Sequence, residues 1–316
     1  MKPKTLQTAI QHFSDEQVCI DTVAALRWPE GVICPACGHK EHYYLKTQKR
    51  WKCKDCNRQF SVKLGTIFED SPIHLSKWLL AMWMIANCKN GVSSYEIHRA
   101  IGVTQKSAWF MLQRIRLAMQ NGSLMKLGGS GTPVQVDETF IGGKARNMHK
   151  SRRVKMDKMS FGNKTIVAGF LDGGTVKTQV IANRSVTTLH AAVKEHVQPG
   201  ANLHTDDFYG YWGLYKDFAH EIVNHAETYV NGKVHTNGIE NFWALLKRGL
   251  SGTYVAVEPF HLFLYLDEQS FRYNNRGNKD KPVNDGERFE MLLSQIAGKR
   301  LTYSALTGKV GETTPF

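Results

Sequence analysis

Four cysteines near the N-terminus constrain this chain most strongly. They form the pattern C-x2-C-x15-C-x2-C, and they are Cys34, Cys37, Cys53 and Cys56. Each C-x2-C turn can aim two thiolates at one point, and two such turns complete the tetrahedral sulfur set that Zn2+ prefers. Two disulfides are the alternative, but the sequence shows no secretory signal, so we expect a cytoplasmic protein, in which disulfides rarely persist. The spacing therefore predicts a zinc ribbon with a short hairpin between the two turns.

The charge balance indicates a polyanionic partner. The chain has 41 Lys and Arg against 28 Asp and Glu, a formal net charge of +13, although solubility alone could account for such a balance. Residues 144–158 carry seven of the cations and one acid, which predicts a flexible basic loop that contacts DNA phosphates. Its candidate DNA-binding residues are Lys150, Arg152 and Arg153. No apolar run approaches the roughly 18 residues that span a membrane, so DNA, not a membrane, is the expected partner.

Residues 75–119 have helical patterns that suggest a DNA-binding domain. Ser93 and Glu96 have the spacing of a capping box, Gly102 permits a tight turn, and Thr104 can cap a second helix. Helix, short glycine-bearing turn and helix is the helix-turn-helix pattern, although a plain helical hairpin has the same signature. The first turn of the second helix would then reach base edges or phosphates. Its residues are Gln105, Lys106 and Ser107.

The sequence changes character after the glycine-rich segment 121–133. Three strand patterns are followed by a helix, a strand, a helix over 208–218, a short strand and a last helix. This order predicts an α/β, ribonuclease H-like catalytic domain in which antiparallel early strands give way to parallel ones. The expected organisation is a helical lead-in and zinc ribbon, a helix-turn-helix domain, the catalytic domain and a C-terminal tail. Their ranges are 1–70, 71–125, 132–290 and 291–316.

Three carboxylates fall where such a fold can bring them together. Asp137 lies in the first strand, Asp206 at the end of the fourth and Glu240 on the last helix. Oxygen ligands suit Mg2+ or Mn2+, and two such metals can activate an attacking oxygen and stabilise a leaving one in phosphoryl transfer. Lys247 lies two helical turns after Glu240 on the same face, where a cation could hold the DNA backbone or could simply be solvated.

Each acid also has a structural interpretation. Glu138 stands beside Asp137, and only strand register decides which of them faces the site. Asp206 could cap the following helix, with Asp207 as the functional acid, and the spacing of Asn237 and Glu240 is that of a helix capping pair.

At these motifs the chain resembles a known family. VDETFIGGK, HTDDFYGY, HTNGIENFWALLKRGLSGTY and YLDEQSFRYNNR occur in this order in bacterial insertion-sequence transposases of the zinc-ribbon-bearing, ISXO-like group of the DDE superfamily. The resemblance extends from about Asp15 to Arg276. It implies a transposase that binds the terminal inverted repeats of an insertion sequence, cleaves the DNA ends and joins them to target DNA with Mg2+. A dimer or higher homo-oligomer on DNA is expected.

The resemblance also suggests roles for the acids. By motif match, Asp137 and Asp206 correspond to the first two catalytic acids and Glu240 to the third. The group varies between Glu and Asn at the third position, so Asn237 and Asn241 remain alternatives. Where the pattern usually has Asp-Gly at the second acid, this chain has two aspartates. Two other functions stay open, a non-catalytic DNA-binding regulator derived from a transposase and a nuclease that cuts without joining.

Overall fold

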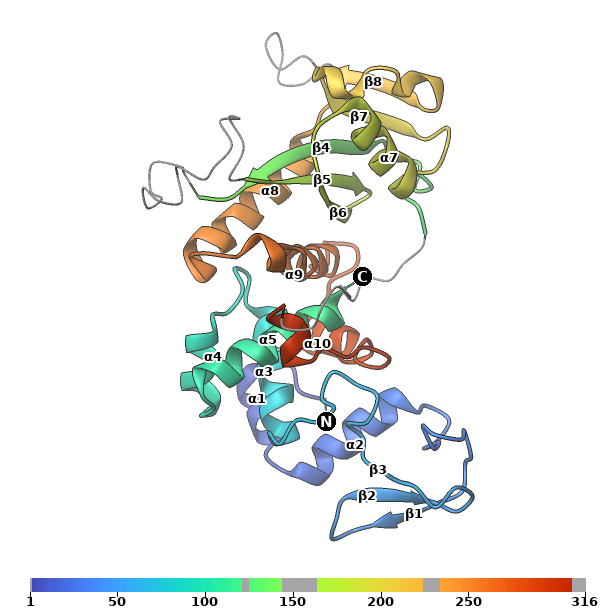
Figure 1. Ribbon diagram of the computed structural model, residues 1–316, viewed down its shortest axis with the longest axis vertical. Coiled ribbons are helices and arrows are strands. Elements are labelled where there is room, and N and C mark those ends of the chain that lie inside the picture. The colour runs from blue at the N-terminus through green and yellow to red at the C-terminus, as the bar shows by residue number, and fades with distance from the viewer. Residues whose placement is uncertain (1, 121–124, 144–163, 224–233, 309–316) are drawn as a thin grey trace. The chain divides into compact units, whose positions relative to one another are not determined.

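The computed structural model describes residues 2–120, 125–143, 164–223 and 234–308 (Figure 1). The chain forms two compact units, one of Met1–Gln120 with Asn275–Phe316 and the other of Asn121–Asn274. The chain therefore returns to its N-terminal unit at Asn275, before the boundary at residue 290 that the sequence indicated. Within the described parts of the chain, no helix is long and apolar enough to cross a membrane.

The first unit begins with two helices and a small antiparallel sheet. These elements are α1 (Leu6–His12), α2 (Glu16–Arg27), β1 (His42–Leu45), β2 (Arg50–Cys53) and β3 (Gln59–Phe60). Strands β1 and β2 form the hairpin predicted between the cysteine pairs. Trp28, which follows α2, packs edge-on against Trp51 and Phe60 of the sheet. These aromatic contacts attach the ribbon to the helices.

The remainder of the first unit is helical. It comprises α3 (Leu75–Asn87), α4 (Ser94–Ile101), α5 (Gln105–Met119), α10 (Asp285–Leu293) and α11 (Tyr303–Leu306). The predicted capping box of Ser93 and Glu96 is formed, Gly102 ends α4 with φ 62°, and the Thr104 side chain caps α5. The Arg114 guanidinium donates to the carbonyl oxygens of Leu301, Ile67 and Glu69, which ties the C-terminal segment to this unit.

The second unit is built on a five-stranded sheet of order β6-β5-β4-β7-β8. Its strands are β4 (Val134–Ile141), β5 (Thr165–Asp172), β6 (Thr175–Ile181), β7 (Asn202–Asp206) and β8 (Ala219–Val223). The first three pair antiparallel, and β7 and β8 continue the sheet in parallel from β4, as the sequence predicted. Its helices are α7 (Val186–His196), α8 (Asn237–Gly249) and α9 (Leu262–Asn274).

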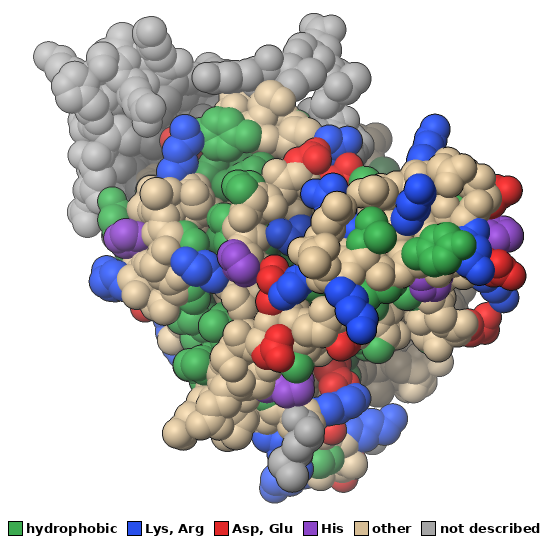
Figure 2. All heavy atoms as spheres, turned by 90° about the horizontal axis from the view of Figure 1, so that it is seen from below, with side chains coloured by type: hydrophobic (Ala, Val, Ile, Leu, Met, Phe, Trp, Pro, Cys, Tyr) green, Lys and Arg blue, Asp and Glu red, His purple; other side chains and the backbone are tan. Residues whose placement is uncertain are grey.

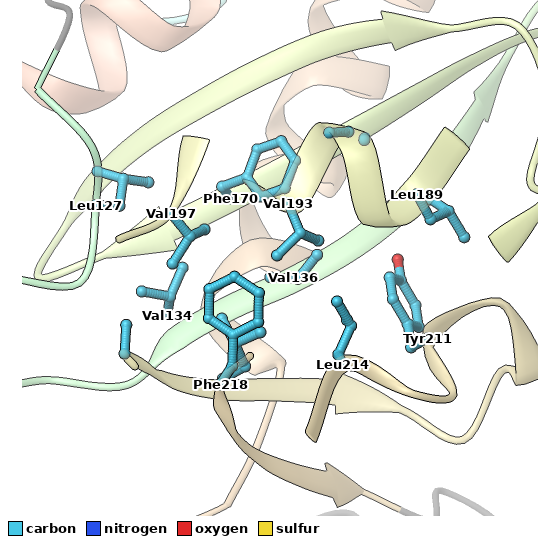
Figure 3. Close-up of a cluster of buried hydrophobic side chains, with 14 of the residues drawn as sticks. Leu127, Val134, Val136, Phe170, Leu189, Val193, Val197, Tyr211, Leu214 and Phe218 are labelled. Atoms are coloured by element: carbon cyan, nitrogen blue, oxygen red, sulfur yellow. The ribbon is translucent and has the colours of Figure 1, made fainter. Parts of the chain in front are cut away.

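Alternating side chains of the central strands supply two separate cores. Val134 and Val136 of β4 contribute to the cluster with α7, which also includes Tyr211 and is drawn in Figure 3. Ile141 of β4 packs against the cluster formed with α8 and α9. Helix α7 therefore covers one face of the sheet, and α8 with α9 covers the other (Figure 1).

The helix predicted over 208–218 was wrong. This segment contains only two 3₁₀ turns, η2 (Tyr209–Tyr211) and η3 (Leu214–Lys216). Gly213 lies between them with φ 95°, a left-handed conformation that interrupts any helix. The segment is nevertheless anchored, because Tyr211, Leu214 and Phe218 are buried in the α7 cluster.

Candidate active site and zinc site

The four cysteine sulfurs converge on one point of the ribbon. All four lie within 4.8 Å of one another, with Cys34 Sγ 3.7 Å from Cys56 Sγ and Cys37 Sγ 3.6 Å from Cys53 Sγ. A disulfide bond would be about 2.05 Å long. A zinc–sulfur distance of about 2.3 Å in a tetrahedron places sulfurs about 3.8 Å apart. The cluster therefore fits a structural Zn2+, in agreement with the prediction.

The backbone of each cysteine pair adopts a matching turn. The residue after the second cysteine has a positive φ in both, 76° at Gly38 and 57° at Asn57. Burial opposes ionisation of Cys34, but hydrogen bonds from the N–H groups of Ala36 and Cys37, and from the thiols of Cys37 and Cys56, lower the pKa of its thiol to about 7. The neighbouring thiols in turn raise the pKa of Cys37. The backbone N–H groups of the turn therefore favour the thiolate at Cys34, the form that binds zinc.

In the second unit, Asp137 lies on the α8 face of β4. Its carboxylate Oδ2 accepts a hydrogen bond of 3.0 Å from Trp243 Nε1 of α8. Burial and, after it, the nearby charges of Glu138 and Asp206 raise the pKa of Asp137 to about 7, against hydrogen bonds that lower it. A partly buried carboxylate with acidic neighbours is a group that a cation would stabilise.

Asp206 lies beside Asp137 across the parallel strand pair. Gln135 of β4 is the register partner of His204 of β7, and each aspartate is two residues further along its strand. The Asp206 Oδ1 atom accepts from the N–H of Phe208 at 3.2 Å, so this acid does shape the turn that follows it. It is half-buried, whereas Asp207 is exposed.

Glu240 lies in the first turn of α8 and is exposed. Its Oε1 accepts a hydrogen bond of 2.8 Å from the hydroxyl of Thr236, the residue at the N-cap of α8. The capping pair of Asn237 with Glu240 is not formed, because Asn237 is already the first helical residue. The helix is held on the sheet by Gln135, whose Oε1 accepts from the N–H of Ile239 at 3.1 Å.

Glu240, Asn237 and Asn241, the three candidates for the third ligand, differ in their positions around the axis of α8. At about 100° per residue, Glu240 and Lys247 lie within about 60° of Trp243 around α8. Asn237 and Asn241 lie on the side away from the buried stripe and are exposed. Glu240 and Lys247 therefore lie on one flank of α8, next to the indole that contacts Asp137.

The three carboxylates lie on the same side of the sheet, but their oxygen atoms do not all lie within 4.8 Å of one another. Across the described ranges, the cysteine cluster is the only group of three or more His, Cys, Asp or Glu whose ligand atoms all lie within 4.8 Å. Asp137 and Asp206 interact electrostatically, whereas Glu240 is engaged by Thr236.

Glu138 points to the opposite face of β4. Its carboxylate accepts hydrogen bonds from the Tyr211 hydroxyl at 2.6 Å and from Arg184 Nη1 at 3.0 Å, and its side chain is 4% exposed. Sequence reasoning identified neither these partners nor Trp243. The signal available was the alternation of strand residues, which places adjacent acids on opposite faces.

The predicted DNA-contacting residues of α5 have partners within the first unit. Gln105 Nε2 donates to Ser94 Oγ at 2.9 Å, and Ser107 bonds with the Thr104 cap. Lys106 is exposed, and its ammonium lies 4.7 Å from the ring centroid of Tyr303. Lys150, Arg152 and Arg153 lie outside the described residues.

Basic side chains are not gathered in one place on the face drawn in Figure 2. Lys and Arg side chains there are interspersed with Asp and Glu. Residues 144–158, with seven Lys or Arg and one Asp, contribute +6 to the net charge of +13. The strongest concentration of positive charge that the sequence predicted therefore belongs to a segment that the structure does not describe.

Comparisons with known proteins match two regions of the chain to known families. Residues 126–274 match the ISXO2-like transposase domain, and residues 14–59 match the transposase zinc-ribbon domain. An uncharacterized protein in transposable element ISH50 of Halobacterium salinarum is 30% identical over 257 residues, which cover 77% of this chain and 85% of that protein. With its cysteine cluster and its mixed sheet inside the two matched regions, the chain belongs to the ISXO2-like transposases.

Proposed function

We propose that this protein is a DNA transposase that binds the terminal inverted repeats of an insertion sequence, cleaves the DNA ends and joins them to target DNA. The observation that carries this proposal is the pairing of Asp137 and Asp206 on adjacent parallel strands, with Glu240 on the neighbouring flank of α8. The strand order, three antiparallel strands followed by two parallel ones, supports a ribonuclease H-like interpretation of this unit.

The donor set fits Mg2+ or Mn2+. It consists of carboxylate oxygens, the ligands of hard cations, and the raised pKa of Asp137 reflects burial and negative charge that a cation would offset. Asp137, Asp206 and Glu240 would hold the metal. When bound, such a metal activates the attacking oxygen and stabilises the leaving oxygen of a phosphodiester.

The residues around the acids orient them and the DNA. The Trp243 indole donates a hydrogen bond to one oxygen of Asp137 and so orients this carboxylate. Lys247 is exposed on the same flank of α8 as Glu240, where its ammonium can contact a backbone phosphate.

DNA recognition is assigned to the first unit and the basic segment. Helices α4 and α5, with their capped turn at Gly102, support a helix-turn-helix interpretation in which Lys106 contacts phosphate. The zinc ribbon and residues 144–158 would add further contacts to the DNA backbone.

The test is an incubation of the full chain with duplexes that carry the two ends of the source element, with Mg2+ and a target plasmid. Nicks at the element ends and covalently joined products are expected. Nicks without joined products would indicate a nuclease. Specific binding to the ends with no nick in Mg2+ or Mn2+ would contradict the proposal and favour the non-catalytic regulator.

A further inference from the structure

We propose that Glu138 and Tyr211 are positioning residues that hold the carboxylate of Asp206 beside that of Asp137. This inference rests on the proposed function, because it concerns the same pair of acids. It assigns Glu138 a role distinct from that of its neighbour.

Glu138 is a buried carboxylate whose hydrogen bonds reach across the fold. Its side chain is 4% exposed, and its two oxygens accept from different elements, Oε2 from Tyr211 at 2.6 Å and Oε1 from Arg184 at 3.0 Å. Tyr211 is fully buried at the end of the α7 cluster near Leu189 (Figure 3). Burying a carboxylate is costly unless its oxygens are satisfied, and both are satisfied here.

These partners connect the strand of the first acid to the segment that follows the second. Glu138 adjoins Asp137 in β4, and Tyr211 ends η2, the 3₁₀ turn that follows Asp206 at the end of β7. Between Asp206 and η2, the N–H of Phe208 donates to Asp206 Oδ1 at 3.2 Å. The hydroxyl of Tyr211 therefore fixes, through one turn of chain, the backbone that orients the Asp206 carboxylate.

Arg184 also contacts both of these segments. Its guanidinium carbon lies 4.8 Å from the ring centroid of Phe140 in β4 and 4.4 Å from that of Phe208. The guanidinium is thus placed against one ring from each acid-bearing segment while it donates to Glu138. A planar guanidinium can make these contacts together, whereas a lysine ammonium cannot.

Packing alone does not account for an acid at this position. The β4 residues that join the α7 cluster, Val134 and Val136, are apolar, and an apolar side chain at 138 would extend that surface without a desolvation cost. The hydrogen bonds of Glu138 with Tyr211 and Arg184 instead require these three side chains to keep one arrangement. Residues that orient metal ligands in this way typically change metal affinity roughly 10- to 100-fold when they are removed.

The experiment measures Mn2+ affinity of the zinc-loaded full chain without DNA, by the electron paramagnetic resonance signal of free Mn2+. Sites that survive in Asp137→Asn are subtracted as background. Tyr211→Phe removes only the hydroxyl that bonds Glu138. Tyr209→Phe is the matched control, because this tyrosine belongs to the same turn but is 57% exposed.

We expect Tyr209→Phe to bind Mn2+ like the wild type and Tyr211→Phe to bind it about tenfold more weakly or worse, with zinc content unchanged and the protein still fully folded at the temperature of the assay. If Tyr211→Phe does not fold, Arg184→Lys serves instead, and the same loss of affinity is expected. Wild-type affinity in the folded variant would overturn this inference alone. A wild type without any Mn2+ site that depends on Asp137 would overturn the proposed function, and the inference with it.

Discussion

The substitution Gly169→Ala tests the packing that joins α8 to the sheet. Gly169 of β5 is the register partner of Asp137, and a Cβ atom there would lie 2.4 Å from Cζ2 and 2.7 Å from Cη2 of Trp243. Carbon atoms in contact are normally about 3.5–4.0 Å apart, so the indole must move by about 1 Å. The Cδ1 atom of Ile239, also on α8, would lie 3.0 Å from the same Cβ, and both side chains are buried, so α8 has little room to yield.

Overpacking of this kind typically costs about 1–3 kcal/mol of folding free energy. Movement of the indole also strains the 3.0 Å hydrogen bond between Trp243 Nε1 and Asp137 Oδ2. We therefore expect Gly169→Ala to lower the unfolding free energy by about that amount, and to lower the rate of DNA-end cleavage more than the folded fraction explains.

The assay combines denaturant unfolding, followed by tryptophan fluorescence, with a cleavage rate measured at saturating protein. Gly252→Ala is the matched control, because its Cβ would meet no atom within 4 Å. Equal stability and equal cleavage rates in the two variants would refute the close packing of Trp243 on β5 and its role in orienting Asp137.

Three further predictions concern the zinc, the buried acid and the DNA-binding helix. Metal analysis should find about one zinc per chain, and Cys34→Ser should lose it and unfold the ribbon while the second unit stays folded; a zinc-free wild type purified without chelator would contradict this. The pKa of Asp137 is raised from 3.8 to about 7, so the folded state holds this proton more tightly than the unfolded chain. Metal-free wild type should therefore lose stability relative to Asp137→Asn as pH rises from about 4 to about 7, and a pH-independent difference between the two unfolding free energies would refute the raised pKa. Lys106→Ala should weaken binding to every DNA sequence and reduce its salt dependence, whereas Gln105→Ala should change preference at one base pair by about 1–3 kcal/mol; unchanged binding curves for both variants across salt concentrations would place recognition elsewhere.

The zinc ribbon and the ends of α4 could be predicted from residues that are close together in the sequence. The cysteine spacing predicted the sulfur cluster, and the capping box at Ser93 and the left-handed Gly102 follow from residues close together in the chain. The prediction of a helix over 208–218 was wrong because Gly213 takes a left-handed conformation in the middle of the segment.

The contacts around the acids depend on residues far apart in the chain. Strand alternation predicts that Asp137 and Glu138 face opposite sides, but their partners decide which side each faces. Trp243 is 106 residues from Asp137, and Tyr211 is 73 residues from Glu138. No local pattern specifies such pairs.

The placement of Asn275–Phe316 in the first unit also depends on residues far apart in the chain. Helix α10 packs against α3, and Asn87 of α3 bonds with both Arg288 and the carbonyl of Asp285. An amphipathic helix pattern predicts that α10 has a buried face, but it does not indicate which unit covers that face.

The most direct measurement of the central claim is the single-turnover rate of end cleavage in Mg2+ by charge-neutralised variants. Asp137→Asn, Asp206→Asn and Glu240→Gln keep shape and most hydrogen bonds but remove the charge that would hold the metal. Each should fold and bind the element ends, yet cleave them several orders of magnitude more slowly than the wild type, while Asn241→Ala should cleave normally. Normal cleavage by Asp137→Asn would contradict the metal site altogether, and loss of activity in Asn241→Ala beside an active Glu240→Gln would contradict the third ligand.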